Sequence, residues 1–226
     1  MQSRRCDGIS DGSLAVAVPD HLVLATRDLD AGAAWLEHHL GAPLAAGGKH
    51  ARMGTHNRLL QLGAGFYLEL IAIDPQAPPP GRPRWFGLDH LDLPADRPRL
   101  IHWVARSEDI VGDAATGGET PVDILDMERG NFRWRIAVPS DGSLPGDGLL
   151  PTLIQWISPH HPADRLPEAG CRLMKLEAFH PRPEGIRGRL AALGLAAKLD
   201  LRSCAAGEAA QLVAYLRCPR GLFELD

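Results

Sequence analysis

The sequence predicts an α+β protein that is built from repeated units of a strand, a helix and further strands. The order strand, helix, strand, strand first occupies residues 20–73, and a similar order recurs over residues 100–157 and 172–226. About 45% of the 226 residues are apolar, which suits a packed core. A few repeats usually build one enclosed structure, because single copies cannot bury their apolar faces alone. We therefore expect one domain over residues 20–226 in which the units share a core.

The first unit has the clearest local signals. A strand is predicted at residues 21–25, which are apolar on both faces after His21. Asp28 fits the N-cap of a helix that ends at Leu40, and Gly41 fits its C-cap. Two strands should follow, at residues 58–62 and 66–73.

The second unit is less regular than the first. We expect a strand at residues 100–104, a short helix at residues 107–115, and strands at 122–127, 131–138 and 152–157.

The third unit should open with a strand at residues 173–179, followed by a helix whose first turn holds Pro183. Three short strands, near residues 197–201, 211–216 and 222–225, should complete the chain.

Three segments lie outside the units. Residues 1–19 resemble a flexible leader, and residues 74–99 and 158–171 are linkers. The first linker carries seven prolines, and long connections without strands often cover functional cavities. We expect this linker to lie at a cavity mouth with Trp85 or Phe86 directed inward. The His160-His161 pair in the second linker is interpreted as part of a surface loop.

Composition limits the partners and the location of the protein. The net charge is −4 with a pI of about 6.2, and basic residues are dispersed, which argues against nucleic acid and anionic membranes as partners. No apolar stretch approaches the roughly 20 residues that span a bilayer. The four cysteines form no C-x-x-C pair and are expected to be free thiols in a reducing cytoplasm.

Polar residues recur at matching first-strand and last-strand positions of the three units. A carboxylate inside an apolar strand is costly unless a metal ion or a cationic side chain pairs with it. These positions therefore mark the candidate site. The pairs are His21 with Glu69, His102 with Gln155, and Lys175 with Glu224.

Three segments carry a resemblance to a known family: "DHLVLATRDLDAGAAWLEHHLG", "GTHNRLLQLGAGFYLELIA" and "LPTLIQW". They resemble the glyoxalase-like domains of the vicinal oxygen chelate superfamily, over about residues 20–225. The resemblance implies repeated βαβββ modules whose curled, mostly antiparallel sheets enclose a central cavity. A ferredoxin-like sandwich pair is the alternative fold that the short repeats permit.

The resemblance also implies one divalent metal, for which Mn, Fe, Ni, Co or Zn are candidates. Matched residue by residue, the ligands are His21, Glu69 and His102, with Gln155 at a position where such domains commonly carry Glu. Two imidazoles and one carboxylate form the ligand set of non-haem iron sites. If the first unit pairs with the third instead, Lys175 enters the site and makes a metal improbable, because a protonated amine cannot ligate.

Further residues are expected to contact a small-molecule substrate. Glu69 and Gln155 are the candidate catalytic residues. The family motif places Asn57 and Arg58 in the pocket, and Tyr67 should face the same side of its strand as Glu69 and Ile71. The remaining candidates for substrate binding are Trp85, Phe86 and Trp156.

Two functions from different classes stay open. The first is a metal-dependent lyase, isomerase or dioxygenase that acts on a small molecule with vicinal oxygens. The second is a metal-free protein that binds or sequesters a small molecule, as bleomycin-resistance proteins do. The sequence leaves the oligomeric state open, a homodimer included.

Overall fold

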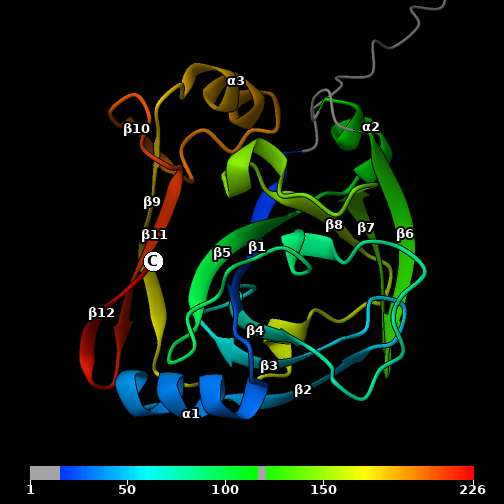
Figure 1. Cartoon of the computed structure of the whole chain (residues 1–226), viewed down its shortest axis with the longest axis vertical. Coiled ribbons are helices and arrows are strands. Elements are labelled where there is room, and N and C mark those ends of the chain that lie inside the picture. Colours follow the sequence, from blue (N-terminus) through cyan, green and yellow to red (C-terminus); the bar gives the residue numbers. More distant parts are fainter. Residues whose placement is uncertain (1–15, 117–120) are drawn as a thin grey trace, which may run out of the picture.

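A computed structural model describes residues 16–116 and 121–226 of the chain (Figure 1). A curled eight-stranded sheet has the strand order β2-β3-β4-β1-β5-β8-β7-β6, and a separate four-stranded sheet has the order β10-β9-β11-β12. Most neighbouring strands run antiparallel. The parallel pairs are β1 with β4, β5 with β8, and β9 with β10.

The first module contributes half of the large sheet and the helix α1. Asp28 accepts a hydrogen bond from Ala31 N at 2.8 Å, and Gly41 ends the helix with a φ of 72°, so both predicted caps are confirmed. The Gly-rich strand β2 was not predicted, because its sequence AAGGKH lacks the β-branched and aromatic residues typical of strands. The elements are β1 (Val18–Ala25), α1 (Leu29–Leu40), β2 (Ala45–His50), β3 (Thr55–Gln61) and β4 (Tyr67–Ile73).

The second module completes the large sheet. Its first strand pairs antiparallel with β1, so that His21 lies opposite Val104 and Val23 lies opposite His102. Modules one and two are therefore the pair that shares a sheet. The elements are β5 (Arg99–Arg106), α2 (Ile110–Ala115), β6 (Val122–Arg129), β7 (Phe132–Pro139) and β8 (Thr152–Trp156).

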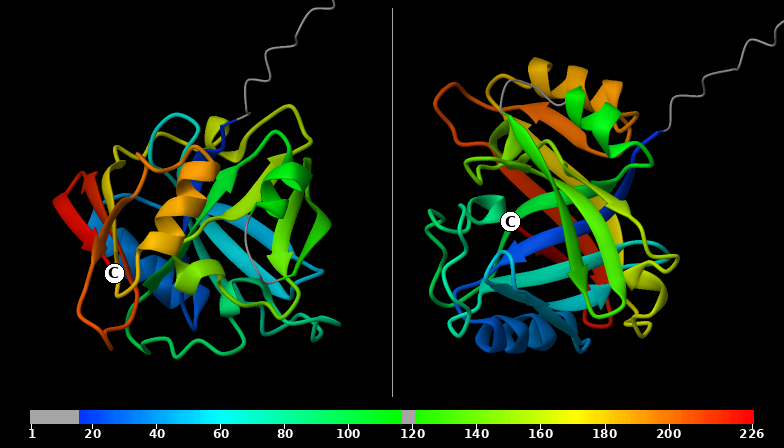
Figure 2. Two further views of the ribbon diagram at one scale, coloured as in Figure 1. Left: turned by 90° about the horizontal axis from the view of Figure 1, so that it is seen from above. Right: turned by 90° about the vertical axis from the view of Figure 1, so that its right-hand side faces the viewer.

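The third module forms the small sheet, which stands beside the outer face of the large one (Figures 1 and 2). Lys175 lies in β9 of the small sheet, where it is exposed and pairs with Glu177 and Asp200 of its own module. Glu224 lies in the last strand, where it is exposed. The elements are β9 (Arg172–His180), α3 (Glu184–Ala192), β10 (Asp200–Ser203), β11 (Gln211–Cys218) and β12 (Gly221–Leu225).

The large sheet separates two apolar clusters. Leu22 and Leu24 of β1 face outward into the cluster shared with α1, α3 and the small sheet. Val23 and Ile71 face inward, together with aromatic side chains of the first linker. Because strand side chains alternate with period two, Tyr67, Glu69 and Ile71 share the inner face, as predicted.

The first linker covers the concave face. Residues 74–98 contain no strand, and a short 3₁₀ helix η1 (Trp85–Gly87) carries two buried aromatic rings into the inner cluster. Both rings line the inner cavity, which confirms the expected cover. The predicted fold class is confirmed as well. No helix within the described ranges is long and apolar enough to cross a membrane.

Candidate functional site

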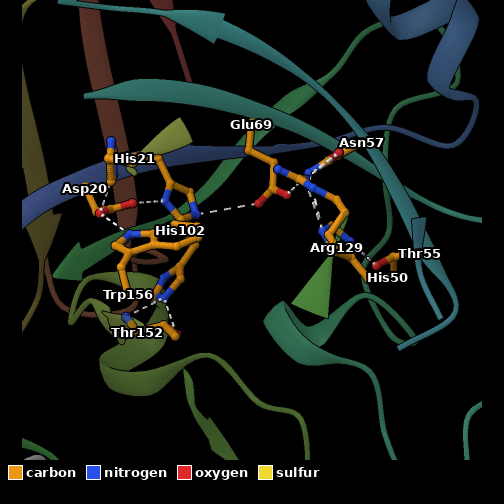
Figure 3. A network of polar contacts seen from close by, with 11 residues as sticks. Asp20, His21, His50, Thr55, Asn57, Glu69, His102, Arg129, Thr152 and Trp156 are labelled. Atoms are coloured by element: carbon orange, nitrogen blue, oxygen red, sulfur yellow. Dashed lines mark hydrogen bonds and ion pairs between the residues drawn. The ribbon is translucent and has the colours of Figure 1, made fainter. Parts of the chain in front are cut away.

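A narrow cavity of about 20 Å³ lies inside the curled sheet, enough for about one water molecule. Figure 3 shows the network of polar contacts that includes His21, His50, Glu69 and Arg129 of its lining. Strands β1, β2, β4 and β6 supply polar side chains to its wall, and five aromatic side chains and two isoleucines also line it. Six residues predicted for the site from the sequence line this cavity. They are His21, Tyr67, Glu69, Trp85, Phe86 and Trp156.

Asp20 is the buried anchor of the site. Its carboxylate has no exposed surface and accepts hydrogen bonds from His21 Nδ1 at 2.7 Å, His161 Nε2 at 2.9 Å and Trp156 Nε1 at 3.0 Å. Burial by itself raises the pKa of Asp20, but the bonds from His161 and His21 outweigh burial and hold it well below 3.8. Asp20 is therefore an anion at any working pH.

His21 is oriented by this anchor. Because Asp20 can only accept, Nδ1 of His21 carries the proton and Nε2 points toward Glu69. Nε2 lies 3.6 Å from Glu69 Oε2, and the imidazole stacks on Tyr67 with ring centroids 4.5 Å apart. Burial and the charges of Asp20 and Glu69 raise the pKa of Tyr67 well above 10, so its hydroxyl keeps its proton.

Glu69 is held by a second polar group. Asn57 Nδ2 donates to Glu69 Oε1 at 2.5 Å, while Asn57 Oδ1 accepts from Gly48 N at 2.9 Å. His50 lies beside Asn57, and its Nδ1 is 3.1 Å from the hydroxyl of Thr55. Burial lowers the pKa of His50 from 6.5 to about 4, so this imidazole is neutral at pH 7.

Arg129 reaches the site from the far edge of the sheet. It is the last residue of β6, and its Nη1 donates to Asn57 Oδ1 at 3.0 Å and lies 3.4 Å from His50 Nε2. Strands β2 and β6 are the two edges of the large sheet. The Arg129 side chain therefore bridges the open side of the curled sheet.

His102 does not join the other two predicted metal ligands. Its Nδ1 lies 2.9 Å from Gly148 O, and its Nε2 accepts from the backbone N–H of Thr152 at 3.0 Å. Burial lowers its pKa from 6.5 to about 4. One ring nitrogen is therefore bonded to the segment before β8 and the other to the first residue of β8. Neither nitrogen is free for a metal.

The donor set consequently does not fit the three-ligand site. Only His21 Nε2 and Glu69 Oε2 approach each other, and within residues 16–116 and 121–226 no group of three or more His, Cys, Asp or Glu side chains could hold an ion. The expected convergence of His21, Glu69 and His102 is wrong. The cause is a competing set of hydrogen bonds, because backbone groups of Gly148 and Thr152, 46 and 50 residues further along the chain, bind His102.

Two other expected positions are also corrected. Ile154 and Trp156 face the cavity, so Gln155 between them faces outward and donates to Glu108 O at 2.5 Å. Arg58 lies between Asn57 and Leu59, which face inward, so its side chain faces outward. There its Nη2 lies 2.6 Å from Oδ1 of Asp30 in α1, with which it forms an ion pair. Neither side chain lines the inner cavity.

Sequence reasoning missed four polar residues of the site: Asp20, His50, Arg129 and His161. His161 was interpreted as a surface residue, but only 8% of it is exposed and it bonds Asp20. The Gly47-Gly48 pair was a signal for close packing at this strand, and it could have pointed to Arg129. A Cβ at position 47 would lie 2.0 Å from Asn57 Oδ1, and one at position 48 would lie 2.7 Å from Arg129 Cδ, so both glycines make room for polar side chains.

A family model described as a glyoxalase-like domain matches residues 20–194, which include the two modules of the large sheet and every polar residue of the site. The chain belongs to this glyoxalase-like family. The family match ends just after α3, so β10, β11 and β12 lie beyond it.

Comparison with solved structures found several that are similar to this glyoxalase-like protein. A hypothetical protein from Staphylococcus aureus is 13% identical, with a TM-score of 0.56 over 93% of this chain and 86% of that one. The methylmalonyl-CoA epimerase of Streptomyces coelicolor is 18% identical, with a TM-score of 0.42 over 65% of this chain and 100% of that one. The methylmalonyl-CoA epimerase of Mycobacterium tuberculosis is 20% identical, with a TM-score of 0.42 over 64% of this chain and 90% of that one. No curated protein matches this chain.

Proposed function

We propose that this protein is an enzyme of the lyase or isomerase type that moves a proton at a carbon next to a carbonyl group of a small molecule. The observation that carries the proposal is the buried Asp20–His21 pair, which aims an unoccupied imidazole nitrogen into an enclosed cavity. Buried ionisable groups are costly, and their concentration in a cavity favours a catalytic role over a structural one.

His21 would act as the general base. The C–H bond next to the carbonyl breaks, its proton moves to His21 Nε2, and the electron pair moves onto the carbonyl oxygen as an enolate. Asp20 and Glu69 flank the ring, so they stabilise the positive charge that the imidazole gains. Return of the proton from Nε2 to carbon completes an exchange or an isomerisation.

The aromatic wall offers donors for the enolate oxygen. The Trp85 indole lines the cavity, and its buried Nε1 has no hydrogen-bond partner among the described residues. A buried donor without a partner is costly, and a substrate oxygen would satisfy it. The Tyr67 hydroxyl, which keeps its proton, is a second donor at the same wall.

The test is hydrogen–deuterium exchange followed by proton NMR. The protein is incubated in D₂O with small aldehydes, 2-oxo acids and 2-hydroxy ketones, and the signal of the proton next to the carbonyl is followed. We expect exchange with at least one compound, and loss of that exchange by about 100-fold or more in His21→Gln. The matched control is His90→Gln, an exposed histidine outside the cavity, which should keep the rate.

The same assay tests the metal that the family resemblance implies. Exchange that persists in EDTA supports proton transfer by the side chains alone. If EDTA abolishes the exchange and Mn, Fe, Ni, Co or Zn restores it, proton transfer by the side chains alone is refuted and the metal-dependent enzyme is supported.

A metal-free binding protein is the second candidate, favoured by the five aromatic side chains around the cavity. Its signature would be tight binding of an aromatic compound with no exchange for any carbonyl compound of the panel.

A further inference from the structure

A wide cleft of about 720 Å³ adjoins the small inner cavity. One side of the cleft is the Gly-rich strand β2, and the other sides are the turn between β6 and β7 and the segment of residues 162–167. The inner cavity holds about one water, whereas this cleft has the volume of a small-molecule site.

The Arg129 side chain separates the cleft from the inner cavity. It lines both the cleft and the inner cavity, and no other residue of the described chain is shared by the two linings. Its side chain passes over Gly48, where a Cβ would stand 2.7 Å from Cδ. The guanidinium then rests on Asn57 Oδ1 at 3.0 Å. The second contact of this guanidinium is His50 Nε2 at 3.4 Å. A long side chain that is held by two hydrogen bonds to neutral groups can rotate at modest cost.

The lining of the cleft also holds three cationic side chains against one carboxylate, that of the exposed Glu128, which forms no ion pair within 4.0 Å among the described residues. The guanidinium carbons of Arg129 and Arg165 each lie 6.0 Å from the centroid of the Phe132 ring, and neither side chain has a carboxylate within 4.0 Å in residues 16–116 and 121–226. Lys49, the third cation of the lining, is already paired with Asp74 at 2.8 Å. Two guanidinium groups beside one aromatic ring form a receptor for a flat anion with an apolar body.

We propose that the cleft binds the carboxylate of the substrate, with Arg129 and Arg165 as its cationic partners and Phe132 against its apolar part. Pairing with the carboxylate draws Arg129 away from Asn57 and joins the cleft to the inner cavity. The carbonyl of the same molecule then reaches His21. The inference rests on the proposed function for the reaction, and it adds the substrate class, a small carboxylate with a carbonyl group.

Binding can be measured without knowing the natural substrate. The probes are phenylacetate and its neutral counterpart phenylacetamide, titrated into the full chain by calorimetry and by tryptophan fluorescence. We expect phenylacetate to bind at least about tenfold more tightly than the amide, because a charge-assisted pair is stronger than a neutral bond. Arg129→Gln and Arg165→Gln should each remove about tenfold or more of that preference. Arg133→Gln, an exposed arginine of β7 outside the cleft lining, is the matched control and should keep it.

The outcomes separate this inference from the proposed function. Equal binding of both probes, or a carboxylate preference that survives in both Arg129→Gln and Arg165→Gln, would overturn the anion site even if exchange is found. Exchange on uncharged carbonyl compounds at a rate that Arg129→Gln leaves unchanged would also overturn it, while the proton-transfer function stands. Carboxylate binding that depends on both arginines, without any exchange, supports the site and refutes the enzyme.

Discussion

Asp20→Asn should disable the proposed base while the fold survives. The carboxylate accepts three N–H groups, one on Oδ1 from His21 and two on Oδ2 from His161 and Trp156. An amide has one acceptor oxygen. It keeps the most bonds when the oxygen replaces Oδ2 and the NH₂ group replaces Oδ1. The NH₂ group then donates to Nδ1 of His21, so the imidazole proton moves to Nε2 and the nitrogen facing Glu69 loses its lone pair.

Two magnitudes follow from this exchange of bonds. Charge-assisted bonds contribute roughly 1.5–3 kcal/mol each and neutral ones about 1 kcal/mol, so three replacements should lower the unfolding free energy by about 1.5–6 kcal/mol. The rate of proton exchange should fall by roughly 10²–10⁴-fold, the usual contribution of a general base.

The assays are urea unfolding at pH 7 and the deuterium-exchange measurement in folded protein. Asp92→Asn is the control, because that side chain is fully exposed and, among the described residues, pairs with Arg27 alone, at 3.2 Å. It should change stability by less than about 0.5 kcal/mol. A folded Asp20→Asn variant that exchanges protons at the wild-type rate would refute the orienting role of Asp20.

Two further predictions concern pH and the glycines of β2. Burial lowers the pKa of His50 and His102 to about 4, so between about pH 6.5 and pH 4 the unfolded chain binds more protons than the folded one. Stability should therefore fall as the pH drops through this window, and His50→Gln should make the fall less steep. Urea midpoints that do not change with pH in this window would contradict the inference that both histidines are buried in the neutral form. Gly47→Ala should cost more stability than Gly48→Ala, because its Cβ would meet Asn57 at 2.0 Å. Gly188→Ala in α3, where a Cβ meets nothing within 4 Å, should be neutral or stabilising, and equal thermal midpoints for all three variants would contradict the crowding at β2.

Local patterns in the sequence determined much of the inner wall. The period of two along β4 places Tyr67 and Glu69 on the concave face, and the caps Asp28 and Gly41 set both ends of α1. The proline-rich linker with its paired aromatic residues predicted a cover over the cavity. Each of these features depends on neighbours in the chain, and for that reason the sequence predicts them.

Tertiary structure decided which of the polar residues meet. Pairing of β1 with β5 brings the first two modules together, and no local pattern distinguishes that pairing from one with the third module. His102 is captured by Gly148 O and Thr152, which lie more than 40 residues away along the chain, so its sequence position alone suggested a ligand. Arg129 reaches Asn57 only because the curl of the sheet brings β6 close to β2. Periodicity sets the face on which a side chain lies, whereas long-range register and competition for hydrogen bonds set its partner.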